Sequence, residues 1–84
     1  DAYVCAVVED CADDGFAELT QRNRFCVGDM VELLTNEGEP ISFAVTELWD
    51  ENGEAITATP HAMMKFKMRL PVNCSALSIL RRIK

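Results

Sequence analysis

The chain has 84 residues, of which 49% are hydrophobic and 26% are charged, and this composition is typical of one globular domain with a single modest core. Its uncharged apolar runs are too short to span a bilayer, which excludes a transmembrane helix. The net charge of −6 argues against an isolated nucleic-acid-binding domain, because such domains are usually basic with clustered lysine and arginine.

The first part of the chain predicts a β-hairpin and a third strand. Residues Tyr3–Glu9 are rich in β-branched and aromatic side chains, and Asp13-Asp14-Gly15 then provides a turn. Residues Phe16–Gln21 are expected to return as the second strand. A further strand is expected over Met30–Thr35, after the break at Gly28.

The middle of the chain predicts a second hairpin. After the loop-forming segment 36–40, apolar and polar residues alternate from Ile41 to Trp49, which indicates one half-buried strand. The dipeptide Asn52-Gly53 is the strongest short hairpin signal in the chain. Residues Ala55–Thr59 are expected to form the returning strand.

The segment Met63–Leu70 shows the clearest strand pattern. A period of two is typical of a strand with one buried and one wet face, and Pro71 would end it. The pattern predicts a buried side of Met64, Phe66, Met68 and Leu70, and a wet side of Met63, Lys65, Lys67 and Arg69. Residues Val72–Ala76 suggest a turn or one helical turn, and Leu77–Ile83 fits either a strand or a helical end.

Together these elements predict an all-β fold. Short strands separated by turns every eight to twelve residues, without a long amphipathic helix, are typical of a sandwich or a barrel. We expect a small antiparallel β-barrel of about six strands, because closure removes the exposed edges that a short sandwich would have to protect. The whole of residues 1–84 would form this single domain.

The chain opens on Asp1 and has no cationic segment followed by an apolar stretch, so we expect a piece of a larger cytoplasmic protein without a signal peptide. Its four cysteines, Cys5, Cys11, Cys26 and Cys74, include no C-x-x-C pair, and the single His61 is distant from them in sequence. These features argue against a zinc site and favour free, mostly buried thiols with no disulfide-linked partner.

Charge is divided unevenly along the chain. Residues 1–54 hold fourteen acids and two bases, a net charge of −12, whereas residues 55–84 hold six bases and no acid. One interpretation is that the two segments pair across a sheet, where each cross-strand ion pair contributes about 0.2–1 kcal/mol. The other is that the bases form a docking surface for a polyanion or an acidic partner.

The second interpretation gives a set of candidate binding residues. The cations of the wet strand face would join those near the end of the chain, and Trp49 could provide a platform on which a base or a sugar stacks, unless it belongs to the core. These candidates are Lys65, Lys67, Arg69, Arg81, Arg82 and Trp49, with Lys84 beside them.

No catalytic site is predicted. Ser42 and Ser75 lack a nearby histidine or a nucleophile-elbow motif, and His61 follows Pro60 at a strand entry, where a structural or solvated imidazole is expected. The paired carboxylates lie at turns, where they cap and solvate the backbone. We therefore expect no metal and no cofactor in this domain.

Several ordered segments resemble the C-terminal domain of peptidase family U32, the collagenase-like peptidases. These segments are NRFCVGDMVELLTNEG, ISFAVTELWDENGEAITATPHA and ALSILRRI, and the match runs from about residue 3 to the end. The matching positions are Arg22, Asn23, Arg24, Phe25, Gly28, Asp29 and Glu32, then Asp50, Gly53, Ile56, Pro60 and His61, then Leu80 with Arg81 or Arg82.

The resemblance implies a barrel similar to the accessory barrels of translation factors, attached behind a larger catalytic domain. The family's catalytic and cluster-binding cysteines would lie in that other domain, so none of the four cysteines here takes over these roles. The family label implies a peptidase that acts on collagen-like protein, while several members look like enzymes that hydroxylate transfer or ribosomal RNA. The domain would then pack on its own catalytic domain and help to bind RNA or an unfolded, collagen-like protein, or it would only stabilise the enzyme.

Overall fold

The computed structural model describes residues 3–35, 38–59, 61, 63–72 and 77–83, and no helix occurs among them. Within this described part, no helix is therefore long and apolar enough to cross a membrane. The strands are β1 (Tyr3–Cys11), β2 (Phe16–Gln21), β3 (Met30–Leu34), β4 (Ile41–Ala44), β5 (Leu48–Asp50), β6 (Ala55–Ile56), β7 (Lys65–Arg69) and β8 (Ile79–Arg82).

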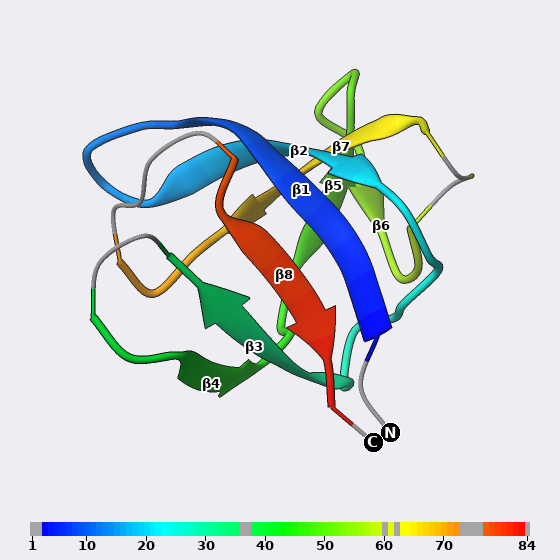
Figure 1. Ribbon diagram of the computed structural model, residues 1–84. Coiled ribbons are helices and arrows are strands. Elements are labelled where there is room, and N and C mark those ends of the chain that lie inside the picture. The colour runs from blue at the N-terminus through cyan, green and yellow to red at the C-terminus, as the bar shows by residue number, and fades with distance from the viewer. Residues whose placement is uncertain (1–2, 36–37, 60, 62, 73–76, 84) are drawn as a thin grey trace.

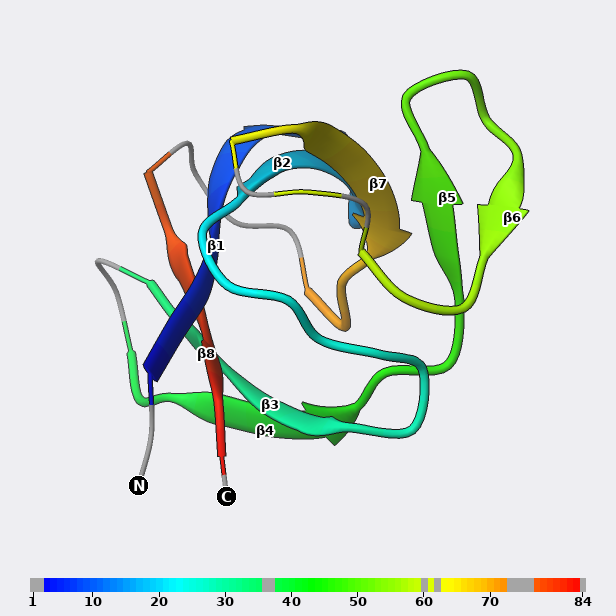
Figure 2. The ribbon, with the colours of Figure 1, turned by 90° about the vertical axis from the view of Figure 1, so that its right-hand side faces the viewer.

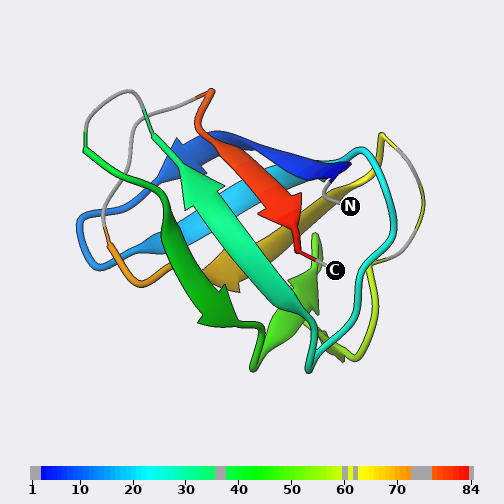
Figure 3. The same ribbon diagram turned by 60° about the horizontal axis from the view of Figure 1, so that its bottom comes forward.

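All eight strands belong to one sheet in the order β4-β3-β8-β1-β2-β7-β5-β6, and every neighbouring pair is antiparallel. The sheet curls into a half-barrel around the core, with the hairpin of β5 and β6 beside β7 (Figures 1 and 2). Strands β4, β3, β8 and β1 lie side by side on the opposite part of the sheet (Figure 3). The predicted antiparallel all-β fold is confirmed, with eight strands in place of about six, and the sheet forms a half-barrel whose edges are β4 and β6.

The strand expected to run from Ile41 to Trp49 is in fact two strands. Val45 continues the pairing of β4, because its N–H donates to the carbonyl of Asp29 at 2.9 Å and its own carbonyl accepts from the N–H of Gly28 at 2.8 Å. The chain then leaves β3, and Trp49 pairs with Lys67 of β7. Alternation in the sequence does not reveal such a change of partner strand.

The last segment is a strand. Leu80 pairs with Ala6 of β1 on one side and with Leu33 of β3 on the other, so β8 fills the position between these strands. The alternative of a helical end for residues 77–83 is therefore wrong. The predicted turn at 72–76 lies mostly outside the described residues.

The inner face of the sheet forms a continuous core. The rings of Phe25 and Phe66 meet edge to face, with centroids 5.5 Å apart. As predicted, Phe66, Met68 and Leu70 are buried, but Met64 is 42% exposed. This part of the prediction is wrong because β7 begins only at Lys65, and Met63 has a positive φ of 69° that interrupts the alternation.

The described cysteines differ in burial. Cys5 is buried and its thiol donates to the carbonyl of Leu80, whereas Cys11 is half-buried and Cys26 is exposed. The expectation of mostly buried thiols is therefore wrong for these three, and Cys74 lies outside the described residues. Burial raises the pKa of the Cys5 thiol to about 12.

The turn between β1 and β2 requires glycine. Gly15 has a φ of +90°, its N–H donates to the carbonyl of Ala12, and its own carbonyl accepts from the N–H of Leu70 at 2.7 Å. A Cβ at this position would overlap the carbonyl oxygen of Leu70. The close approach fixes the ends of β2 and β7 relative to each other.

We expect Gly15→Ala to destabilise the domain more than Gly53→Ala, as measured by urea denaturation. Gly53 has a similar φ of +88°, but an added Cβ would meet nothing within 4 Å. Gly53→Ala should therefore cost only the left-handed penalty of about 1–2 kcal/mol, and Gly15→Ala that penalty plus the displacement of Leu70. Equal losses of stability would contradict the close approach.

We also expect the free energy of unfolding to fall between pH 8.5 and 12 because of Cys5. In the unfolded chain the thiol ionises near its ordinary pKa of about 8.5, while in the folded domain it stays protonated up to about 12. Stability from this group is fully present below the unfolded pKa and is lost as the pH rises. Denaturation of Cys5→Ala over this range should show a weaker decline; an identical decline in both proteins would contradict the assignment.

Candidate functional site

Four of the six candidate binding residues come together on the outer face of β2, β5 and β7. Lys65, Lys67 and Arg69 point outward at alternate positions of β7, and Lys67 pairs directly with Trp49 of β5. The register of β2 and β7 also places Phe16 opposite Arg69. We call this surface the β5–β7–β2 face and define it by Phe16, Trp49, Lys65, Lys67 and Arg69.

An aromatic pair lies at the centre of this face. The ring of Trp49 is half-buried against Phe16, with centroids 5.4 Å apart, and the guanidinium carbon of Arg69 lies 5.3 Å from the Phe16 centroid. Trp49 therefore points outward and does not belong to the buried core. Sequence reasoning placed Phe16 at the start of a strand but did not include it among the candidate binding residues, because only the register of β2 and β7 brings it beside Arg69.

Arg69 already has an anionic partner. Its Nη1 lies 3.1 Å from Oδ2 of Asp14, and the other carboxylate oxygen of Asp14 accepts from the N–H of Phe16. The hydrogen bond from Phe16 and the guanidinium of Arg69 both lower the pKa of Asp14. Both side chains are largely exposed, so solvent screens the ion pair and a competing anion has access to Arg69.

The cationic stripe also has acidic neighbours. Glu18 lies opposite Lys67 on β2 and Asp10 lies opposite Glu18 on β1. These three residues and Phe16 help to line an open depression of about 280 Å³. Lys65 lies opposite Thr20. The hydroxyl of Thr20 donates to Oε2 of Glu9 at 2.7 Å, so a carboxylate also lies on the β1 side of Lys65.

Two further cations lie near Lys65 and were not among the candidates. Arg22 and Arg24 are exposed in the loop after β2. Arg22 directly follows Gln21, whose N–H donates to the carbonyl of Met64, the residue before Lys65, at 2.9 Å. Their occurrence as Arg-Asn-Arg within the otherwise acidic first part of the chain was a signal in the sequence.

Arg81 and Arg82 do not join this surface. Arg81 forms an ion pair with Glu32 of β3. Arg82 donates to the hydroxyl of Tyr3 at 3.1 Å and lies 3.3 Å from Asp29, and both contacts raise its pKa. Pairing between the acidic and basic segments thus accounts for these two cations and for Arg69; Lys84 lies outside the described residues.

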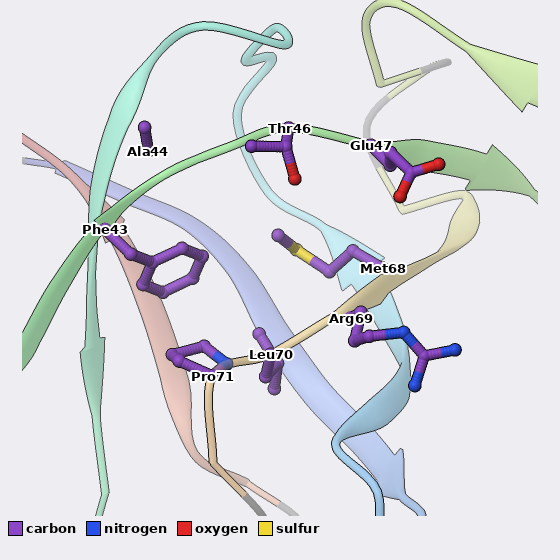
Figure 4. Close-up of a pocket in the computed structure, with 8 residues that line it drawn as sticks. All are labelled: Phe43, Ala44, Thr46, Glu47, Met68, Arg69, Leu70 and Pro71. Carbon is purple, nitrogen blue, oxygen red and sulfur yellow. The ribbon is translucent and has the colours of Figure 1, made fainter.

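A second depression lies where the curled sheet stays open, because β4 and β7 approach each other there without forming a hydrogen-bonded ladder. It has a volume of about 260 Å³ and lies between the edge strand β4 and the end of β7. Figure 4 shows Phe43, Met68, Leu70 and Pro71 grouped around it, while the guanidinium of Arg69 points away from Phe43. The depression is mainly apolar and contains none of the other candidate residues.

The residues of the β5–β7–β2 face are suited to binding a ligand. The described residues contain no group of three or more His, Cys, Asp or Glu side chains that could hold a metal ion. His61 is exposed, and the acids on the β5–β7–β2 face lie beside cations. Aromatic rings beside lysines can stack on a planar group and contact anions.

Known proteins with similar sequences and structures cover almost the whole chain. It is 29% identical over 82 residues to the tRNA hydroxylation protein P1 of Bacillus subtilis (strain 168), an alignment that covers 98% of this chain and 19% of that relative. The chain therefore spans about a fifth of the length of this curated relative.

Two solved structures are similar at 26% sequence identity, and both are of the C-terminal domain of a Geobacillus thermoleovorans protein classed as a U32 peptidase. The first has a TM-score of 0.90 and covers 96% of this chain and 92% of its own. The second, a selenomethionine variant, has a TM-score of 0.86 and covers 94% and 98%. The family model for the peptidase family U32 C-terminal domain matches residues 1–81, and the chain therefore belongs to that family.

Proposed function

We propose that this chain is a non-catalytic accessory domain of a larger U32-family enzyme, and that its β5–β7–β2 face contacts the RNA substrate of that enzyme. The observation that carries the proposal is the pairing of Lys67 with Trp49 across β5 and β7. Proteins that bind single-stranded nucleic acid combine cations along the phosphates with aromatic rings on which bases stack. The β5–β7–β2 face offers both within one row of the sheet.

The charges of this face favour contact with a few phosphates. Lys65 and Lys67 form no ion pair with any residue that the structure describes, and Arg69 forms one with the exposed carboxylate of Asp14. A domain with a net charge of −6 would not hold RNA on its own over a long surface. In this proposal it adds a small number of contacts to those of the catalytic domain.

The curated relative favours RNA over a protein substrate. That protein is named for tRNA hydroxylation, and its similarity to this chain extends over 98% of the chain. The U32 family name favours a peptidase that acts on a protein, such as a collagen-like one. Lysines beside an outward-facing tryptophan fit the nucleic-acid substrate better, because they match both phosphates and bases.

A purely structural role is the second candidate. Arg69, Arg81 and Arg82 from the basic segment are all paired with acids from the first part of the chain. Such pairs hold the sheet together and need no ligand. In that case the domain would stabilise its enzyme and leave substrate affinity unchanged when its surface lysines are replaced.

We expect Lys65→Gln and Lys67→Gln each to weaken binding of total transfer RNA to the full-length enzyme. Each lost phosphate contact should also reduce the slope of log affinity against log salt by about 0.7–0.9. Fluorescence anisotropy over a range of salt concentrations measures both effects. The control is Ser42→Glu, which lowers the net charge by the same amount at an exposed position of β4. If all three substitutions weaken binding equally, the loss reflects net charge and not a specific contact. If neither lysine substitution changes RNA affinity, the structural role is favoured.

We expect Trp49→Ala to weaken RNA binding by about 1–3 kcal/mol and to leave the salt slope unchanged, because stacking on a base releases no counterion. The same anisotropy series measures this. Circular dichroism of the variant checks that the domain stays folded, since Trp49 also packs on Phe16. Unchanged affinity in a folded variant would exclude Trp49 from the contact.

A further inference from the structure

The two outer faces of the sheet differ in chemistry. The strand register places Val7 opposite Ile79 and Ile79 opposite Leu34. The next row of paired residues, which contains Leu80, belongs to the buried core. Since side chains alternate along a strand, the first row points outward. We define the β1–β3–β8 face by the outward residues Val4, Val7, Met30, Leu34, Ile79 and Ile83.

The outward residues of this face are apolar, whereas a face that is fully exposed to solvent would carry mainly polar residues. Val4 is 37% exposed and Met30 is 46% exposed, and the other members are half-buried. On the neighbouring strands β2 and β7, the outward positions are mostly polar or charged, such as Glu18, Lys65 and Lys67. An apolar surface of several adjacent residues on a soluble domain marks an interaction site.

The two charges at the centre of the apolar face neutralise each other, and the carboxylate of Glu9 lies at its edge, where it accepts a hydrogen bond from Thr20 opposite Val7. Arg81 lies opposite Val4 and Glu32, and its guanidinium pairs with the Glu32 carboxylate. A partner that covers the centre of the face would bury Arg81 and Glu32 as a neutral pair, which lowers the cost of burying their charges, while Glu9 at the edge stays hydrogen-bonded to Thr20. An apolar surface around a self-neutral ion pair fits a neutral, apolar partner surface.

We propose that the β1–β3–β8 face is the surface on which the rest of the U32 polypeptide packs. The inference rests on the proposed function only in taking this chain as a domain of a larger enzyme, and it does not depend on RNA. The family model describes a C-terminal domain, and the chain spans 19% of its curated relative. A polypeptide that precedes such a domain enters it through β1, which lies beside β8 (Figures 1 and 3). Strand β1 itself contributes Val4 and Val7 to the face.

Native methionines test this packing without any substitution. Met30 lies on the face, whereas Met63 and Met64 lie outside it and are 63% and 42% exposed; Met68 is buried. Hydrogen peroxide oxidation, followed by peptide mass spectrometry, is carried out on the full-length enzyme and on the 84-residue chain. We expect Met30 to oxidise several-fold more slowly in the full-length enzyme, with Met64 as the internal standard for the oxidant.

A Met30 that oxidises at the same rate in both proteins overturns the proposal, and the RNA contact is unaffected by that result. Protection of Met30 that increases with protein concentration also overturns it, because a second copy would then be the partner. Val4→Glu should remove the protection in the full-length enzyme. Val72→Glu is the matched control, since Val72 is 38% exposed and follows β7 near the Gly15 turn, away from the face.

Discussion

The position of β8 between β1 and β3 is the constraint on which the whole sheet depends. Without β8, no ladder of hydrogen bonds would join β3 and β4 to the other five strands, β1, β2, β7, β5 and β6. Leu80 is fully buried at this junction, and the two residues that follow it are fixed by ion pairs, Arg81 with Glu32 and Arg82 with Asp29. Because these contacts join residues 49 and 53 positions apart in the chain, the core closes only when the last strand is in place. Long-range pairing of this kind costs chain entropy, and burial of Leu80 with the rest of the shared core helps to offset that cost.

The same contacts explain why a family resemblance can be recognised here without a catalytic motif. The segment that contains Gly28, Asp29 and Glu32 and the closing segment with Arg81 and Arg82 are two of the ordered pieces that resemble the U32 C-terminal domain, and in the structure they contact each other. Asp29 also accepts a hydrogen bond from the backbone N–H of Cys26, which stabilises the turn before β3. These residues therefore specify the fold, and their presence gives no information about the chemistry of the larger protein.

The sequence predicted most strands because a period of two is a local signal, and the alternation from Phe66 to Leu70 correctly predicted one side of the core. It did not predict the exposed Met64 or the break after Val45, because both depend on where a partner strand ends. The candidate site was predictable only in part for the same reason. Lys65, Lys67 and Arg69 share a face by alternation alone, whereas Trp49 joins them only through the register of β5 and β7. The partner of Arg69 is Asp14, 55 positions away, and spacing along the chain gives no indication of that distance in space.

The outer surface of the barrel changes character along single rows of the sheet. One row runs from Leu34 through Ile79 and Val7 to Thr20 and Lys65, so it is apolar on β3, β8 and β1 and becomes polar at β2. All these residues lie over one shared core, and a substitution that unfolds the core would remove both faces together. The contributions of the two faces can therefore be tested separately only by substitutions of outward side chains. An accessory domain with one packing face and one cationic face can hold a substrate beside a catalytic domain without supplying any catalytic group.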